Sequence, residues 1–192
     1  MNDDSIREVL RKLGALREGH FLLASGLHSP AYVQCARVLE HPTESTPLFQ
    51  HLAKSWTEAG VQAVLGPAYG GILVAYGLAA ALGVRAMYAE RVDGKMALRR
   101  GFDVSNGLRV LVAEDVVTTG GSALETVDLL NAHGARVVGV TSLIDRTGGS
   151  NPFPVPFTPL LRLDLPAVPA ADCALCRQGI PLETPGRKQL KA

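Results

Sequence analysis

Two adjacent carboxylates, Glu114 and Asp115, stand between the apolar run 110–113 and a loop of threonine, glycine and serine at 118–122. An apolar-periodic helix is expected to follow at 123–133. A buried strand, a tight loop and a helix in this order aim backbone N–H groups and hydroxyls at one point near the positive end of a helix dipole. This arrangement favours a phosphate monoester. Adjacent acids are costly unless they meet hydroxyls or a cation, so the run predicts a site for a phosphorylated ribose with a metal.

Three other loops could follow a strand in this way. An ordinary strand-to-helix turn needs one capping hydroxyl, which leaves the paired acids unexplained. A Walker-type loop places lysine before serine or threonine, and a dinucleotide fingerprint needs Gly-x-Gly-x-x-Gly. The run 110–122 has neither pattern.

Length and composition narrow the class of protein. The chain has 192 residues, of which 47% are hydrophobic and 19% charged, so one domain with a substantial core is expected. A net charge of +1 argues against a nucleic-acid surface. No apolar stretch is long enough for a bilayer, and three cysteines suit a reducing cytoplasm, so a cytoplasmic protein without membrane contact is expected.

Strands and helices alternate through the middle of the chain. Helices are expected at 5–16, 46–59, 71–82 and 123–133, and strands at 21–23, 32–35, 63–65, 84–88, 109–113 and 136–143. The proline-rich stretch 151–169 predicts an edge strand and loops. Such alternation favours a parallel, doubly wound sheet whose ligands bind at the carboxyl ends of its strands. The carboxylate pair and the glycine-bearing turn 66–71 both lie at such ends.

The run 110–122 resembles the phosphoribosyl-diphosphate signature of the type I phosphoribosyltransferases. The resemblance implies an α/β fold with a mostly parallel doubly wound sheet, helices on both faces, and a small hood. One domain, 1–192, would divide into a core of about 41–149 and a hood from about 1–40 and 150–192. The residues implied to contact the sugar diphosphate are Glu114, Asp115, Val116, Val117, Thr118, Thr119, Gly120, Gly121 and Ser122, with Arg91 and Lys95.

Further segments narrow the resemblance to orotate phosphoribosyltransferases of a bacterial subgroup. Segment 21–32 is similar to their hood, and segment 173–182 to the subgroup's tail. The pair Asp145-Arg146 matches a pair of that family. The turn Ala68, Tyr69 and Gly70 resembles the pyrophosphate-binding turn.

The resemblance implies a reaction in pyrimidine (UMP) biosynthesis. Orotate and 5-phospho-α-D-ribose 1-diphosphate would give orotidine 5′-phosphate and pyrophosphate. Thr118 and Arg146 fall on the positions that recognise orotate, and a guanidinium suits its carboxylate. Mg²⁺ is the implied cofactor, carried by the sugar diphosphate and reached by Glu114 and Asp115 through water.

A basic loop at 91–100 is implied to reach the neighbouring site of a homodimer. Arg91 and Lys95 keep the spacing of two family cations, and with Asp115 they are the expected catalytic residues. Val92 and Ala97 stand where a lysine and a histidine are usual. Whether Arg99 and Arg100 replace those charges stays open, and a solvated hairpin with surface cations is the alternative.

The spacing Cys173-x-x-Cys176 also occurs in zinc and redox sites. A structural zinc site needs four ligands, and the sequence offers no second pair or histidine cluster nearby. The five histidines show no mutual spacing for a metal. We therefore expect a structural role for the two thiols and no metal ligand among the histidines.

Two other functions compete with this interpretation. A purine phosphoribosyltransferase would share the ribose phosphate chemistry but lack Arg146 and the hood motif. A non-catalytic regulator could bind the same sugar diphosphate, but such proteins usually carry a basic face or an added nucleic-acid-binding element. The choice of base distinguishes an orotate enzyme from a purine enzyme, and pyrophosphate release distinguishes either enzyme from a regulator.

Overall fold

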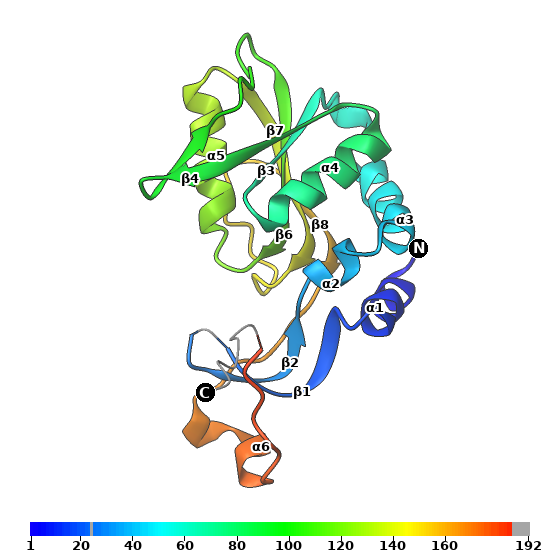
Figure 1. Cartoon of the computed structure of the whole chain (residues 1–192), viewed down its shortest axis with the longest axis vertical. Helices are drawn as coiled ribbons and strands as arrows, with labels where there is room; N and C mark the ends of the chain where they lie inside the picture. Colours follow the sequence, from blue (N-terminus) through cyan, green and yellow to red (C-terminus); the bar gives the residue numbers. More distant parts are fainter. Residues whose placement is uncertain (24, 186–192) are drawn as a thin grey trace.

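A six-stranded sheet forms the centre of the computed structural model, which describes residues 1–23 and 25–185 (Figure 1). Its strands, in spatial order, are β5 (Lys95–Leu98), β4 (Arg85–Val92), β3 (Ala63–Pro67), β6 (Arg109–Val117), β7 (Arg136–Asp145) and β8 (Phe157–Arg162). Neighbouring strands are parallel except for β4 and β5. The expected mostly parallel, doubly wound sheet is confirmed, and the expected edge strand in 151–169 is β8.

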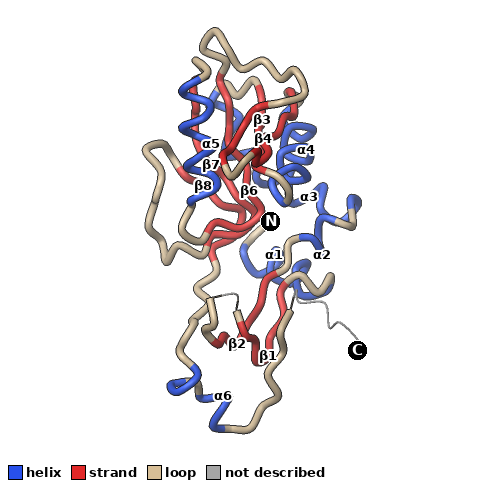
Figure 2. Tube along the Cα trace, turned by 60° about the vertical axis from the view of Figure 1, so that its left-hand side comes forward, coloured by secondary structure: helices blue, strands red, loops and turns tan. Residues whose placement is uncertain are grey.

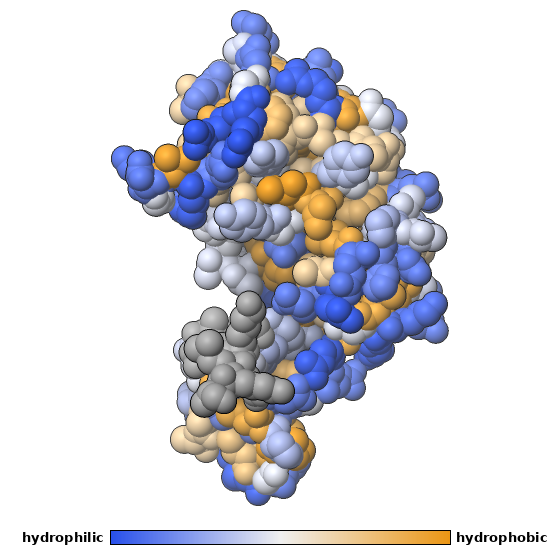
Figure 3. All heavy atoms as spheres, in the orientation of Figure 1, coloured by the Kyte–Doolittle hydropathy of each residue, from blue (hydrophilic) through white to orange (hydrophobic). Residues whose placement is uncertain are grey.

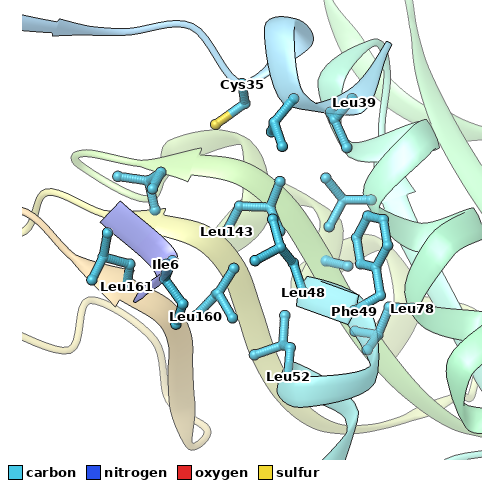
Figure 4. Close-up of a cluster of buried hydrophobic side chains, with 14 of the residues drawn as sticks. Ile6, Cys35, Leu39, Leu48, Phe49, Leu52, Leu78, Leu143, Leu160 and Leu161 are labelled. Atoms are coloured by element: carbon cyan, nitrogen blue, oxygen red, sulfur yellow. The ribbon is translucent and has the colours of Figure 1, made fainter. Parts of the chain in front are cut away.

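Helices cover both faces of this sheet. Helices α3 (Pro42–Ala53) and α4 (Gly70–Leu82) pack on one face, and α5 (Gly121–Ala132) packs on the other. Strand residues alternate between the faces, so Val64 and Leu111 join the first core while Leu65 and Val112 join the second. Figure 4 shows the first core, where leucines from α3 and α4 meet residues of the sheet. Burial on both faces explains why the strands read as continuous apolar runs.

The remaining helices are each shorter than α3, α4 and α5. They are α1 (Asp3–Lys12), α2 (Ala36–Leu39), the 3-10 helices η1 (Lys54–Ala59) and η2 (Ala170–Asp172), and α6 (Ala174–Arg177). The helix expected at 5–16 ends earlier because Gly14 adopts φ +69° and Leu16 already begins a strand. The helix expected at 46–59 starts earlier, at Pro42, because proline suits a first helical turn.

A second, two-stranded sheet lies apart from the central one (Figures 1 and 2). It pairs β1 (Leu16–Leu22) with β2 (His28–Val33), and we call it, with segment 163–183, the hood. The later segment contacts the hairpin through bridges between His28 and Val168 and between Phe21 and Glu183. Strand β8 belongs to the central sheet instead. Only the part of the expected hood segment 150–192 that follows β8 contacts the hairpin. Ala24 and 186–192 of the expected hood lie outside the described residues.

The expectation that no histidine cluster lies near Cys173 and Cys176 is wrong. His20, His28, Cys173 and Cys176 meet in space, with their ligand atoms all within 4.8 Å of one another. The histidines lie on the two strands of the hairpin and the thiols on the returning segment, so their separation in sequence hides the cluster.

Among the described residues, no helix is both long and apolar enough to cross a membrane.

Candidate active site

The junction between β6 and α5 holds the residues predicted to bind phosphate and ribose. Strand β6 continues to Val117, beyond the predicted end at 113, because it stays paired with β7 up to Asp145. Glu114 and Asp115 therefore lie within the strand, near its carboxyl end. Gly120 adopts φ +80°, and a Cβ there would lie 2.8 Å from Pro152 Cγ, so this turn requires glycine.

An open cavity of about 400 Å³ faces this junction. Its walls are Arg91, Glu114, Asp115, Val116, Val117, Thr118, Thr119, Gly120, Gly121, Ser122, Ala123 and Glu125. No side chain of the described residues caps the start of α5, so the first N–H groups of that helix are available at the cavity. A helix N-terminus beside two threonines and a serine provides donors for an anion such as a phosphate.

The two acids have unequal surroundings. Glu114 is half-buried, and burial together with the neighbouring Asp115 charge raises its pKa to about 8. Asp115 Oδ1 accepts a hydrogen bond from the Val116 N–H at 2.8 Å. Carboxylate oxygens in this arrangement are the donors that a hard divalent cation prefers, and they accept hydrogen bonds from a diol. The residues present therefore fit Mg²⁺ and a ribose.

A second strand-to-helix turn approaches the same acids. It runs from β3 through Ala68 and Tyr69 to Gly70 at the start of α4, and the Ala68–Tyr69 peptide bond is cis. A Cβ on Gly70 would clash with the Asp115 carboxylate, so only glycine allows this approach. The turn lies beside the cavity without forming part of its wall, and Tyr69 is 88% exposed.

The basic loop is a β-hairpin made by β4 and β5. Asp93 and Gly94 form its turn with φ of +50° and +80°, which suits a two-residue connection. Arg91 lines the cavity, and its Nη1 lies 2.8 Å from Glu125 Oε2 of α5. Lys95 begins β5, is exposed, and is absent from the cavity wall. The structure thus brings Arg91 to the predicted site and leaves Lys95 outside it.

The two further arginines of the loop pair with an acid on their own hairpin. Arg99 Nε and Arg100 Nε lie 3.9 Å and 3.4 Å from Glu90 Oε1. Neither arginine lines the cavity.

Arg146 lies at the carboxyl end of β7, next to the loop 118–122. Its backbone N–H donates to the Val117 carbonyl at 2.8 Å. Its Nε is buried and has no hydrogen-bond partner among the described residues, and burial lowers the pKa of its guanidinium. An unsatisfied buried donor of this kind suits an anionic ligand.

Asp145 is held by the protein itself. It is fully buried, and it accepts hydrogen bonds from the Thr147 N–H and from Arg162 Nε, both at 2.7 Å. Burial alone would raise the pKa of this carboxyl, but the two donors outweigh burial and hold the pKa below its usual value. Asp145 is therefore paired with Arg162 rather than with the neighbouring Arg146.

Sequence reasoning missed Glu125. This residue stands in the second turn of α5, lines the cavity and holds Arg91. The sequence did carry a signal for it. Glu125 stands four residues after Gly121, so on a helix that begins at the cavity it lies on the same face as Gly121. The partner Arg91 lies 34 positions earlier, and only the fold reveals it.

Comparison with known proteins agrees with this geometry. A model of the phosphoribosyl transferase domain matches residues 46–152. The orotate phosphoribosyltransferase of Thermotoga maritima is 53% identical over 186 residues, which are 97% of this chain and 100% of that protein. That of Desulforamulus reducens is 46% identical over 190 residues, 99% of this chain and 100% of that protein.

Solved structures give the same result. The orotate phosphoribosyltransferase from Aeropyrum pernix superposes with a TM-score of 0.68 at 27% identity, covering 82% of this chain and 93% of that one. The Mycobacterium tuberculosis enzyme in complex with inorganic phosphate gives a TM-score of 0.66 at 29% identity, covering 83% and 94%.

The fold, the β6–α5 junction and the domain match define the class as the phosphoribosyltransferases, which are glycosyltransferase enzymes. Identity of about one half over nearly the whole chain narrows the class further. The chain belongs to the orotate phosphoribosyltransferase family.

Proposed function

We propose that this protein transfers the phosphoribosyl group of 5-phospho-α-D-ribose 1-diphosphate to orotate. The products are orotidine 5′-phosphate and pyrophosphate, a step of pyrimidine (UMP) biosynthesis. The observation that supports the proposal most directly is one cavity lined by an uncapped helix start, three hydroxyl residues and two adjacent carboxylates. Those groups match a phosphate at one end of a ribose and a diol at the other.

The loop 118–122 holds the 5′-phosphate through its backbone N–H groups and hydroxyls. Glu114 and Asp115 bind the ribose hydroxyls, directly or through water on Mg²⁺. When bound, Mg²⁺ neutralises charge on the diphosphate leaving group. The two carboxylates orient the sugar so that its anomeric carbon is open to attack on the face opposite pyrophosphate.

Arg146 and Thr118 position orotate. The buried Nε of Arg146 lacks a partner among the described residues, which supports a role in binding the orotate carboxylate. Thr118 is exposed on the phosphate loop, whose preceding residue Val117 is hydrogen-bonded to the Arg146 backbone. The base and the ribose phosphate are then bound by one continuous junction.

The hairpin 91–100 closes over the diphosphate. Arg91 exchanges its ion pair with Glu125, which is exposed and screened by solvent, for the diphosphate oxygens. Lys95 lies outside the cavity wall of its own chain, so it reaches the diphosphate bound in the neighbouring subunit's site. Closure excludes water that would hydrolyse the activated sugar.

We also propose a homodimer in the cytoplasm, with the hairpin reaching the neighbouring site. Apolar side chains gather over α4 in Figure 3, and Leu73 and Tyr76 of that helix are 52% and 69% exposed. A partner that covers this surface would remove unfavourable apolar exposure. The described cysteines are free thiols, which fits a reducing compartment.

The decisive experiment offers the protein 5-phospho-α-D-ribose 1-diphosphate with orotate, adenine, xanthine or hypoxanthine, with and without Mg²⁺. We expect pyrophosphate release that requires both orotate and Mg²⁺. Release with a purine instead would assign a purine phosphoribosyltransferase. Tight binding of the sugar diphosphate without turnover of any base would assign a regulator.

A further inference from the structure

The hood contains a four-residue cluster that plays no part in the proposed transfer reaction. It is formed by His20 of β1, His28 of β2, Cys173 before α6 and Cys176 within α6. Three of these residues are buried, with exposed fractions of 2%, 6% and 3% for His20, His28 and Cys173. Cys176 is the most exposed of the four and closes the cluster toward solvent.

The spacing of the ligand atoms fits one tetrahedral ion. Cys173 Sγ and Cys176 Sγ lie 3.4 Å and 3.7 Å from His20 Nε2, and Cys176 Sγ lies 3.3 Å from His28 Nδ1. Bonds of about 2.05 Å to nitrogen and about 2.3 Å to sulfur place such atoms about 3.5 Å apart around zinc. His20 Nε2 and His28 Nδ1 are 2.8 Å apart and would separate by about 0.5 Å around the ion.

The surroundings orient the imidazoles for binding. His20 Nδ1 lies 2.8 Å from the Ile180 carbonyl, so it donates its proton there and leaves Nε2 free as a ligand. The backbone of His28 exchanges two hydrogen bonds with Val168, at 2.8 Å and 2.9 Å. The ligands are therefore set by two paired strands and by the segment that crosses them.

We propose that His20, His28, Cys173 and Cys176 bind one structural zinc ion that fastens the returning segment to the β1–β2 hairpin. Two thiolates with two imidazoles form a closed donor set, which zinc favours over hard cations such as Mg²⁺. A closed set leaves no position for substrate or water, so the ion is structural rather than catalytic.

The hood needs such a fastening because its own apolar core is small. Phe21, Ala31 and Cys173 are buried there, but they belong to neither of the two large cores. A two-stranded sheet alone is marginally stable in water. An ion that joins His20 to Cys173, 153 positions later, closes a long loop and ties the hairpin to segment 163–183. Figures 1 and 2 show this segment returning alongside the hairpin, with α6 at the end of the hood farthest from the central sheet.

The test begins with the metal content of the purified full-length protein. After incubation with zinc and removal of free ion, elemental analysis should find about one zinc per chain, and cobalt exchange should give the visible absorption of tetrahedral thiolate-bound Co²⁺. His28→Ala and Cys176→Ser should each lose the cobalt absorption and most of the zinc. Cys35→Ser and His133→Ala, a thiol and a histidine outside the cluster, should keep both.

A second measurement stays informative if a variant fails to fold. In the wild-type protein, a strong zinc chelator should speed hydrogen exchange at least about tenfold for the amides that tie the hood together. These amides belong to Leu22, His28, Val168 and Glu183. Amides of the six-stranded sheet should keep their protection. Three outcomes would overturn the proposal. The wild-type protein takes up no zinc, the His28→Ala variant binds zinc as well as the wild type does, or the purified protein contains a Cys173–Cys176 disulfide in place of the metal.

Discussion

Glu114 holds its proton more tightly than an ordinary glutamic acid does. Burial and the adjacent Asp115 raise its pKa to about 8, so in the free protein the carboxyl is largely protonated at neutral pH. Ribose hydroxyls or a divalent ion would favour the charged form. Ligand binding and release of this proton are therefore coupled.

The first prediction concerns the pH dependence of stability in the metal-free, ligand-free protein. The folded pKa of Glu114, about 8, exceeds its usual value of 4.5, so the folded state binds more protons between those two values. The free energy of unfolding should therefore fall as pH rises from 5 to 8, and Glu114→Gln should make that fall smaller by on the order of 1–2 kcal/mol. Urea unfolding at several pH values measures the difference. Parallel pH curves for the two proteins would contradict the assignment.

The second prediction concerns Lys95, which the structure leaves outside the cavity wall. If its charge acts mainly on the departing diphosphate, Lys95→Ala should lower kcat about a hundredfold while changing orotate affinity less than about threefold. Steady-state kinetics with a separate orotate binding measurement gives both values. Arg136→Ala removes an exposed cation at the amino end of β7 and should leave both unchanged. Unaltered turnover in Lys95→Ala would remove that residue from the mechanism.

At the scale of elements, the site is built where two strand-to-helix junctions converge. The β6–α5 junction supplies the loop 118–122 and the acids, and the β3–α4 turn comes close enough to touch Asp115. Both helices begin with glycine, at Gly70 and Gly121. The two glycines differ in what surrounds them, and this difference can be tested.

The third prediction compares alanine at these two helix starts. A Cβ on Gly70 would meet the Asp115 carboxylate, so Gly70→Ala should lower the free energy of unfolding by about 1–3 kcal/mol and weaken binding of the sugar diphosphate. At Gly121 the nearest atom to a Cβ is Thr119 Oγ1 at 3.9 Å, so Gly121→Ala should change stability by less than about 0.5 kcal/mol. Chemical unfolding of both variants measures these changes in the free energy of unfolding. Equal losses would show that the contact with Asp115 is unimportant.

Local patterns located most elements but misjudged several of their ends. Helices α4 and α5 begin within two residues of their predicted starts. Strand β6 runs four residues past its predicted end because pairing with β7 extends it, and pairing partners cannot be read from one segment. Strand β5 was expected only within one alternative, a surface hairpin, and its turn at Asp93 and Gly94 accounts for the hairpin geometry. The function of the hairpin's cations stays a prediction.

At the scale of the whole molecule, the question is whether one chain completes its own site. Lys95 lies outside the cavity of its own chain, and an apolar surface on α4 stays exposed. Both features fit the proposed dimer in which the hairpin 91–100 serves the partner's site.

The fourth prediction tests this arrangement by mixing inactive subunits. Lys95→Ala and Asp115→Asn should each be nearly inactive alone. Mixed after dissociation, they should recover about a quarter of wild-type activity, because half of the dimers are hybrids and each hybrid has one intact site. Verified hybrid dimers without activity would indicate that every site is self-contained.

The sequence by itself determined the alternation of strands and helices and the residue types that gather at the β6–α5 junction. Both are written in contiguous residues, where apolar periodicity and a run of acids, hydroxyls and glycines carry the physical signal. Only the tertiary structure decided that Gly70 touches Asp115, that Arg91 pairs with Glu125, and that two histidines meet two distant cysteines. Those contacts join residues far apart in the chain, and strand register and chain crossings set them rather than any local pattern.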